Sequence, residues 1–299
     1  MPRKPSQADE ATRIARMLKA AGVFEKQHGV TVGPGDDCAV VSRPDGEVIL
    51  KTDVVVETVH YLAEAAPHWI GWKAAARVVS DFAAMGAQPR HALVTIGMDP
   101  QRDPKWAESV YRGIGRCAKR HGFCLVGGET TRVPSGSFLN VAMSGDVGPH
   151  TMLRSGGKAG DVLAVTGRLG GSAAGKHLRF EPRLAEGIWL AEQRGVRAMM
   201  DLSDGLASDL PRLAKASGCG YSVMADAVPR NRGCDAAAAM SDGEDYELLL
   251  ALAPEAWTKL ASAWRRRFPK LLLTRIGALE TPGFQSGLSG KGHDHFIDQ

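Results

Sequence analysis

The sequence predicts a two-domain protein of the mixed α/β (α+β) class, with one half over residues 1–149 and the other over residues 150–299. The 299 residues are enough for two domains of ordinary size. The composition is 44% hydrophobic and 23% charged, as in a typical globular protein. Segments with strand and helix patterns alternate in both halves. Gly148-Pro149 and Ser155-Gly156-Gly157 interrupt these patterns, so the domain boundary is expected near residue 150.

The N-terminal half reads as one helix followed by alternating strands and helices. Residues 8–27 predict an amphipathic helix, because apolar side chains recur there at helical spacing, at Ile14, Met17, Leu18 and Ala21. Short runs rich in apolar residues predict strands over residues 38–42, 48–57, 92–98 and 138–145. Helical spacing between these runs predicts helices over residues 68–85 and 104–120.

The C-terminal half opens with the apolar run Asp-Val-Leu-Ala-Val-Thr (161–166), which predicts a buried strand. Helices are expected near residues 183–194 and 205–216. Further strands are expected near residues 221–225, 246–252 and 271–277. Strands and helices therefore share this half as well.

Composition and charge exclude several classes of protein. No apolar run approaches the ~18 residues that a membrane span requires, and no secretory signal is visible, so a cytoplasmic protein is expected. The five cysteines form no CxxC pair, which predicts free thiols rather than disulfides or a zinc cluster. The net charge of +4 includes one basic run, residues 264–267, which is typical of a solvated helix end. No nucleic-acid-binding motif is present, so neither nucleic acid nor membrane is an expected partner.

Acidic residues in glycine-rich turns and at strand ends carry the chemical signal. Six segments share this character: Gly33–Asp37, Lys51–Asp53, Ser80-Asp81, Gly127–Thr131, Asp201–Gly205 and Asp242–Asp245. Each alone is more typical of a capped turn, and Asp204 could simply begin the helix over residues 205–216. Together they suit a nucleoside triphosphate carried on several Mg²⁺ ions, because Mg²⁺ prefers carboxylate oxygens and glycine lets phosphate approach backbone N–H groups.

Motifs of other enzyme classes are missing from the sequence. There is no P-loop, no protein-kinase HRD or DFG, no GxSxG elbow and no HExxH zinc motif. The glycine-rich stretch Gly167–Ser172 lacks the spacing of a dinucleotide-binding loop. A nucleotide site, if present, must therefore be built from the acidic segments.

Taken in order, long segments of the chain resemble the thiamine-monophosphate kinases. The matching segments are Gly-Pro-Gly-Asp-Asp-Cys-Ala (33–39), Thr-Asp with His (52, 53, 60), Trp-Lys-Ala-Ala-Ala (72–76), Ser-Asp-Phe-Ala-Ala-Met-Gly-Ala (80–87), Gly-Gly-Glu-Thr-Thr-Arg (127–132), Arg-Ser-Gly-Gly-Lys-Ala-Gly-Asp (154–161), Asp-Leu-Ser-Asp-Gly-Leu (201–206), Gly-Glu-Asp-Tyr-Glu-Leu (243–248) and Gly-His-Asp-His-Phe (292–296). This family belongs to an ATP-binding superfamily that also holds aminoimidazole ribonucleotide synthetase, selenophosphate synthetase and a hydrogenase-maturation protein.

The resemblance implies a fold and an activity. The fold is like that of aminoimidazole ribonucleotide synthetase, with an N-terminal α/β half that forms a homodimer through its strands and a C-terminal α+β half that completes the active site. The activity is transfer of the ATP γ-phosphoryl to thiamine monophosphate, with several Mg²⁺ ions, giving thiamine diphosphate and ADP. The alternative is a member of the superfamily that acts on another small substrate or has lost turnover.

The resemblance also implies roles for matching residues. Metal ligands are expected at Asp37, Thr52, Asp53, Asp81, Glu129, Asp201 and Asp204, and catalytic roles at Asp53, Asp81, Arg154 and Asp204. ATP contacts are expected from Tyr111, Gly128, Glu129, Arg154 and Ser203, and thiamine monophosphate contacts from His60, Glu244 and His293. Structural roles stay open for His60 as a hydrogen-bonding residue, Tyr111 as core and Arg154 as surface.

The chain departs from the family pattern at four places, of which Glu129, and Gly171 with its shortened segment, favour the alternative function. Glu129 stands where the family usually has Asp, and His293 where it has a larger aromatic residue. Lys51 replaces a hydroxyl residue, where its charge could contact phosphate or compete with a metal ion. Gly171 replaces Asp in a segment, residues 170–183, that is shorter than in the family and forms part of the expected cleft wall.

Overall fold

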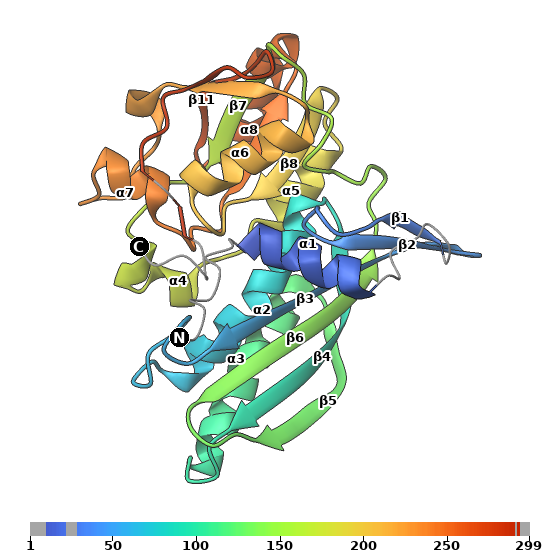
Figure 1. Ribbon diagram of the computed structural model, residues 1–299, viewed down its shortest axis with the longest axis vertical. Helices are drawn as coiled ribbons and strands as arrows, with labels where there is room; N and C mark the ends of the chain where they lie inside the picture. The colour runs from blue at the N-terminus through green and yellow to red at the C-terminus, as the bar shows by residue number, and fades with distance from the viewer. Residues whose placement is uncertain (1–9, 22–28, 291, 294–299) are drawn as a thin grey trace, which may run out of the picture.

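A computed structural model describes residues 10–21, 29–290 and 292–293, and shows two halves that each contain a six-stranded sheet (Figure 1). In the N-terminal half the sheet order is β1-β2-β3-β6-β4-β5. These strands are β1 (Val30–Val32), β2 (Ala39–Arg43), β3 (Gly46–Val56), β4 (Gln88–Met98), β5 (Cys124–Arg132) and β6 (Ser137–Asp146). Among the strands that the structure describes here, only β4 and β5 pair in parallel, so this is a mixed sheet.

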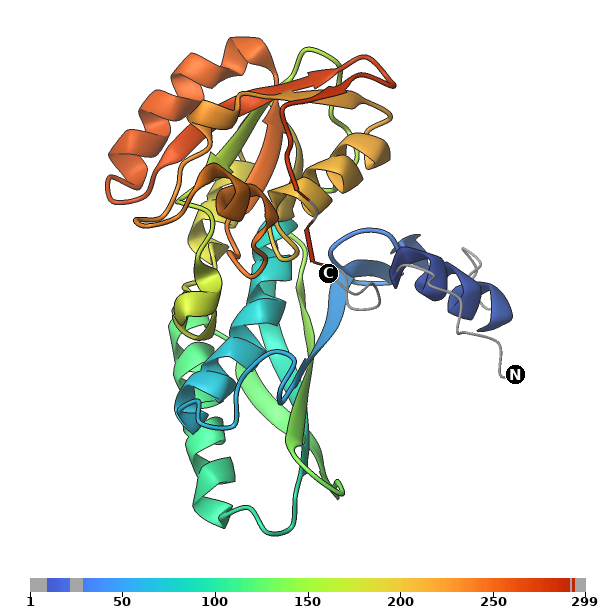
Figure 2. The same ribbon diagram turned by 60° about the vertical axis from the view of Figure 1, so that its left-hand side comes forward.

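Helices α2 (Pro67–Ala84) and α3 (Pro104–His121) lie together on one side of this sheet, while α1 (Glu10–Ala21) stands apart on the other side (Figure 2). Each of the two paired helices begins with a proline, which suits the first turn of a helix. They approach closely at two glycines: a Cβ on Gly71 would lie 1.9 Å from the Val110 carbonyl oxygen, and one on Gly113 would lie 1.9 Å from that of His68. This packing fixes α2, which carries much of the functional site.

Side chains on β3 alternate between the two faces of the sheet, as the twofold period of a strand requires. Ile49 and Val55 are buried beneath the helices, and Lys51 and Asp53 share their side. Leu50 and Val54 are exposed on the opposite face, which we call the outer sheet face. Leu50 lines a shallow apolar hollow there with Leu93 and Val126, which are also exposed.

The C-terminal half has the sheet order β12-β9-β11-β7-β10-β8. Its strands are β7 (Val162–Thr166), β8 (Val196–Asp201), β9 (Gly220–Val223), β10 (Leu248–Leu252), β11 (Leu273–Glu280) and β12 (Gln285–Ser286). Its α-helices are α4 (Lys176–Arg179), α5 (Leu184–Ala191), α6 (Leu206–Ala216), α7 (Ala236–Ser241) and α8 (Trp257–Arg267). Residues of β7 alternate between an apolar cluster that includes α6 and another that includes α5 and α8, so helices cover both faces of the sheet.

The two halves meet where α2 packs against α5 and β8. A Cβ on Gly187 of α5 would lie 2.0 Å from the Ala83 carbonyl oxygen of α2, so glycine allows this close approach. One apolar cluster runs from the core of the N-terminal half into the C-terminal half. The last turns of α2 are thereby held beside the end of β8.

The structure differs from the expected elements in several places. The segment expected as a glycine-rich turn at residues 127–131 lies inside edge strand β5, and β8 was not expected. Asp53 lies within β3 rather than at its end. The first helix is described from Glu10 to Ala21, and the rest of its expected range lies outside the described residues. No helix in the described part of the chain is long and apolar enough to cross a membrane.

Candidate functional site

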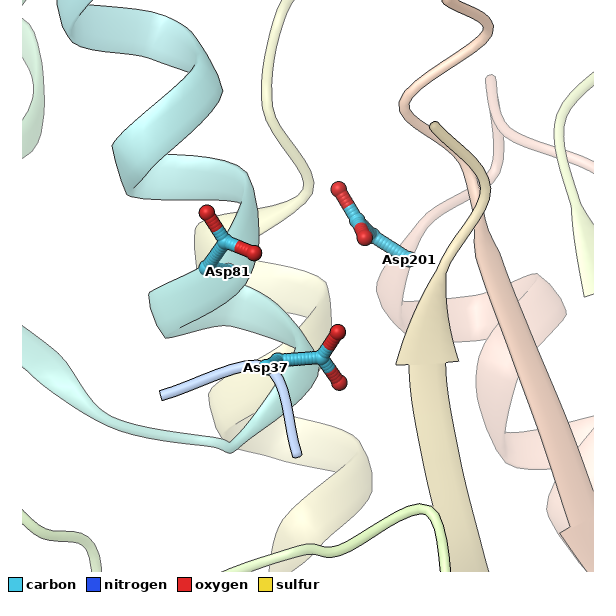
Figure 3. A group of neighbouring side chains, drawn as sticks. All are labelled: Asp37, Asp81 and Asp201. Carbon is cyan, nitrogen blue, oxygen red and sulfur yellow. The ribbon is translucent and has the colours of Figure 1, made fainter. Parts of the chain in front are cut away.

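Three carboxylates from distant parts of the sequence form a buried group, which we call the acidic cluster (Figure 3). Asp37 lies between β1 and β2, Asp81 lies in α2, and Asp201 ends β8. One carboxylate oxygen from each lies within 4.8 Å of the other two. Both halves of the chain therefore contribute to the cluster, through the contact of α2 with β8.

Each carboxylate of the acidic cluster has one oxygen engaged by a neighbouring side chain. Arg154 donates to Asp37 Oδ1 at 2.6 Å. Lys51 Nζ donates to Asp81 Oδ1 at 2.8 Å. Ser80 donates its hydroxyl hydrogen to Asp201 Oδ2 at 2.6 Å.

The acidic cluster has the character of a divalent cation site. Burial raises the pKa of Asp81 well above its ordinary value. Burial and the nearby charge of Asp37 raise the pKa of Asp201 to about 7. Asp37 Oδ2 is buried and has no hydrogen-bond partner among the described residues. Crowded carboxylates with an unpartnered oxygen fit Mg²⁺, which prefers hard oxygen ligands.

A row of charged side chains extends from the acidic cluster along one face of α2. Lys73, Arg77 and Asp81 are four residues apart, so they lie one above another on the helix. Arg77 donates to the Val54 carbonyl oxygen at 2.9 Å and its guanidinium lies 4.0 Å from Asp53 Oδ1. Asp53 is therefore near Arg77, and the described structure groups it with neither Asp37 nor Asp201.

Next to this row is a polar cavity of about 290 Å³ between the two halves. Five residues with predicted roles line it: His60, Ser203, Asp204, Glu244 and His293. Arg77, Asp242 and Tyr246 also line it. The loop that supplies Glu244 and Tyr246 holds both at positive φ, 64° and 51°, a conformation that these residue types seldom adopt. The surrounding packing must hold this loop in place.

Lys73 ties this loop to the N-terminal half. Its side chain is 0% exposed, and Nζ donates to the His60 carbonyl oxygen at 2.6 Å and to Glu244 Oε2 at 2.7 Å. His177 Nδ1, from α4, lies 2.8 Å from Lys73 Nζ and 2.9 Å from Glu244 Oε2. Burial lowers the pKa of Lys73 to about 8, although Glu244 opposes this shift. Burial alone would raise the pKa of Glu244, but His177 and Lys73 lower it to about 2.

Asp204 lies apart from the acidic cluster, just before α6. Its carboxylate pairs with Arg212, which also pairs with the buried Asp209 at 2.9 Å. The Asp204 backbone N–H donates to Asp209 Oδ2 at 3.0 Å. Asp204 thus lines the cavity just before α6, but Gly205 occupies the N-cap position and no side chain caps the helix, so Asp204 is not a helix cap.

Four other residues with predicted roles lie away from the cluster and the cavity. Thr52 is on the outer sheet face, where its hydroxyl bonds Asn140 at 2.9 Å. Gly128 and Glu129 are on β5, three strands from β3 and so roughly 14 Å away at ~4.8 Å per strand. Tyr111 is a partly buried residue of α3 that packs against the core. Within one chain these residues do not meet Asp81.

Sequence reasoning missed Lys73, Arg77 and His177 as site residues. A signal was present for two of them: Lys73 and Arg77 interrupt a mostly apolar helix at four-residue spacing, in line with Asp81. A charge buried at such positions requires a partner. No comparable signal marked His177, because its role depends on where α4 packs.

Comparison with known proteins identifies both halves. Residues 35–147 match the family model for the N-terminal domain of AIR synthase related proteins. Residues 158–267 match the model for the C-terminal domain of the same proteins. The matches follow one another along the chain, in the order of the two halves.

Curated relatives and solved structures are similar over most of the chain. Thiamine-monophosphate kinase of Rhodopirellula baltica is 35% identical, over 76% of this chain and 77% of the relative. The thiamine-monophosphate kinase of Salmonella typhimurium is 36% identical, over 73% of this chain and 75% of the relative. The structure of AaThiL complexed with AMPPCP and TMP has a TM-score of 0.84 at 26% identity and covers 98% of both chains. The structure of thiamine-monophosphate kinase from Stenotrophomonas maltophilia K279a has a TM-score of 0.74 at 28% identity, and the match covers 94% of this chain and 96% of that chain.

Two family models cover successive parts of the chain, the full-length fold is shared, and curated relatives exceed one third identity over three quarters of their length. This chain therefore belongs to the thiamine-monophosphate kinases of the AIR synthase related family.

Proposed function

We propose that the chain transfers the γ-phosphoryl group of ATP to thiamine monophosphate, giving thiamine diphosphate and ADP. The observation that carries this function is the proximity of a cation site to a substrate-sized polar cavity. Arg77 lines the cavity and lies one helical turn, about 6 Å along the axis, from Asp81 of the acidic cluster. A phosphoryl donor on metal ions and an acceptor in the cavity would therefore be neighbours.

The reaction requires charge neutralisation more than proton transfer. The acceptor is a phosphate monoester with a second pKa near 6, so it is largely ionised at neutral pH and needs no strong base. Two anions must approach each other, and Arg77, Arg154 and Lys51 supply positive charge along their path. Bound Mg²⁺ would add neutralisation of the phosphate charge.

The residues that would hold Mg²⁺ are those of the acidic cluster, Asp37, Asp81 and Asp201, with Asp53 nearby. Their burial and the unpartnered Asp37 Oδ2 support this assignment. Arg154 is suited to an ATP phosphate, because its guanidinium already lies beside Asp37. Asp204 remains a proposed catalytic residue at the cavity, where it would have to part from Arg212 to bind a metal ion.

Thiamine monophosphate would occupy the cavity. Glu244 offers a carboxylate, and His60 and His293 lie on the walls. Ser203 faces the same space and is proposed to contact ATP. Segment 170–183 is short, but it is anchored close to its start, just before Ala173, which lines the cavity: Gly170 N–H and Ser172 donate to Asp245 at 2.9 and 2.7 Å. This anchoring favours an active enzyme over a relative that has lost turnover.

A homodimer through the outer sheet face is also proposed. Leu50, Val54, Leu93 and Val126 expose apolar surface there, and its burial would stabilise association. Glu129 shares a pairing row with Thr95, Asn140 and Val54, which places it on this face with Thr52. A second copy would bring these residues, and β5 with Gly128, into an interface. A cytoplasmic location and the lack of nucleic-acid partners stay predictions from the sequence.

A coupled ADP-release assay tests the proposed function. The chain is incubated with MgATP, with and without thiamine monophosphate, and products are identified by mass. We expect ADP release that requires thiamine monophosphate and matches thiamine diphosphate in amount. ADP release that is independent of thiamine monophosphate, or none at all, would overturn the proposal.

A further inference from the structure

Lys51 brings a positive charge into the acidic cluster itself. It lies on the helix-facing side of β3, between Ile49 and Asp53 in the alternating pattern. Its side chain is 21% exposed, and its ammonium is 2.8 Å from Asp81 Oδ1. This oxygen belongs to a carboxylate that would hold Mg²⁺, so the Lys51 ammonium and a metal ion would compete for the same oxygen atom.

Two side-chain cations already offset part of the negative charge of the cluster without any metal ion. The carboxylates of Asp37, Asp81 and Asp201 carry a formal charge of −3, and the contacting Lys51 and Arg154 carry +2. Asp201 is the member whose partner, Ser80, is neutral. Beside the cluster, Asp53 and Arg77 offset each other. Asp36, whose carboxylate accepts from the Arg154 backbone N–H next to Asp37, adds a further formal negative charge. Among the described residues, the group thus retains about two negative charges for incoming cations.

We propose that Lys51 is a built-in cation of the acidic cluster, occupying a ligand oxygen of Asp81 and taking the place of one divalent ion. The inference rests on the proposed function, because it assigns Mg²⁺ to these carboxylates. An ammonium and a divalent ion repel each other at a distance of a few ångström, and this repulsion is strong where water is excluded. The chain therefore binds fewer divalent ions, or binds one of them more weakly, than the three carboxylates alone would.

Direct measurement of metal binding separates this role from catalysis. Mn²⁺ is titrated into the nucleotide-free protein, and bound and free ion are distinguished by electron paramagnetic resonance. We expect Lys51→Met, which keeps the side-chain length without the charge, to bind one additional Mn²⁺ or to bind Mn²⁺ roughly tenfold more tightly, the scale expected for loss of one nearby unit charge. Lys51→Arg retains the charge and should bind Mn²⁺ like the wild type.

Arg90→Met is the matched control for net charge. Arg90 also pairs with a carboxylate on the N-terminal sheet, Asp146 at 2.7 Å, but is 49% exposed and outside the acidic cluster. The Arg90→Met variant should leave Mn²⁺ binding unchanged. Thermal unfolding of each variant with and without Mn²⁺ provides a second readout, in which Lys51→Met should gain the largest stabilisation from the metal ion.

Two results would overturn the inference. Unchanged stoichiometry and affinity in a folded Lys51→Met variant would show that the ammonium does not compete. Weaker Mn²⁺ binding would show that Lys51 supports the ligands instead of replacing an ion. Because no substrate is present, these outcomes are independent of turnover; a wild type that binds Mn²⁺ but makes no thiamine diphosphate would contradict the proposed function alone.

Discussion

Replacing Lys73 by methionine removes the charge that holds the cavity loop against the N-terminal half. Methionine fills nearly the same volume, so the main change is the loss of an ammonium with contacts to His60, His177 and Glu244. The Glu244 carboxylate would then keep one hydrogen-bonding partner, His177. The loop would lose the Lys73 contact, which helps to hold its backbone at the unfavourable positive φ angles. We therefore expect the variant to unfold more easily and to bind thiamine monophosphate more weakly.

The magnitude follows from breaking a buried ion pair. Removing one partner of such a pair costs about 3–5 kcal/mol. Glu244 is 28% exposed, so water compensates in part, and a loss of roughly 2–3 kcal/mol is more realistic. For a chain of this size that corresponds to a fall in melting temperature of roughly 3–5 °C. A misplaced Glu244 should raise KM for thiamine monophosphate roughly tenfold, the equivalent of ~1.4 kcal/mol, and leave KM for ATP nearly unchanged.

Calorimetry and steady-state kinetics measure these effects, with Lys176→Met as the matched control. Lys176 pairs with Asp245 at 3.3 Å in the same wall segment and makes no contact with Glu244. Lys73→Met combined with Glu244→Gln should recover part of the lost stability, because no unpaired charge remains. Equal rises in both KM values, or strictly additive losses in the double variant, would refute the positioning role of Lys73.

Three further predictions concern the cluster and the helix packing. Asp81→Ala should lower kcat by about 100-fold or more while thiamine monophosphate binding, measured by calorimetric titration, changes less; equal losses of both would contradict the assignment. Burial and the charge of Asp37 raise the pKa of Asp201 to about 7, above ~3.9 in the unfolded chain, so the metal-free protein should lose stability as pH rises from 4 to 8. Mg²⁺ should therefore raise the melting temperature more at pH 8 than at pH 5, and an equal rise at both would count against the site. Gly71→Ala should destabilise the chain by about 2 kcal/mol or more in denaturant unfolding, because its Cβ would meet the Val110 carbonyl oxygen at 1.9 Å; Gly115→Ala, where a Cβ meets nothing within 4 Å, is the control.

The elements that could be predicted from the sequence are those whose apolar residues alone indicate that they are buried. The runs that form β7 and β10 are buried at every position, and both were expected. Strand β5 was missed because it is an edge strand with mostly exposed residues, and its glycines and threonines have the composition of a loop. Pairing with β4 makes it a strand, and that pairing is a long-range contact.

The candidate site shows the same limit. The sequence placed Asp37, Asp81 and Asp201 among the metal ligands, and the structure brings these three together. It could not separate them from Thr52, because adjacent strand residues face opposite sides of a sheet and only the fold reveals which side is functional. Asp204 lies just before helix α6 and also lines the cavity. A pattern of Asp and Gly in the sequence does not distinguish a residue beside a helix from a residue of a binding site.

The fate of the γ-phosphoryl group tests the central claim most directly. The wild-type chain is incubated with Mg²⁺, thiamine monophosphate and ATP labelled in the γ-phosphate, and labelled products are separated by chromatography. A thiamine-monophosphate kinase places the label in thiamine diphosphate, and Asp81→Ala slows that transfer by about 100-fold or more. Label that appears in inorganic phosphate, or stays in ATP when every component is present, would contradict phosphoryl transfer to thiamine monophosphate by this chain.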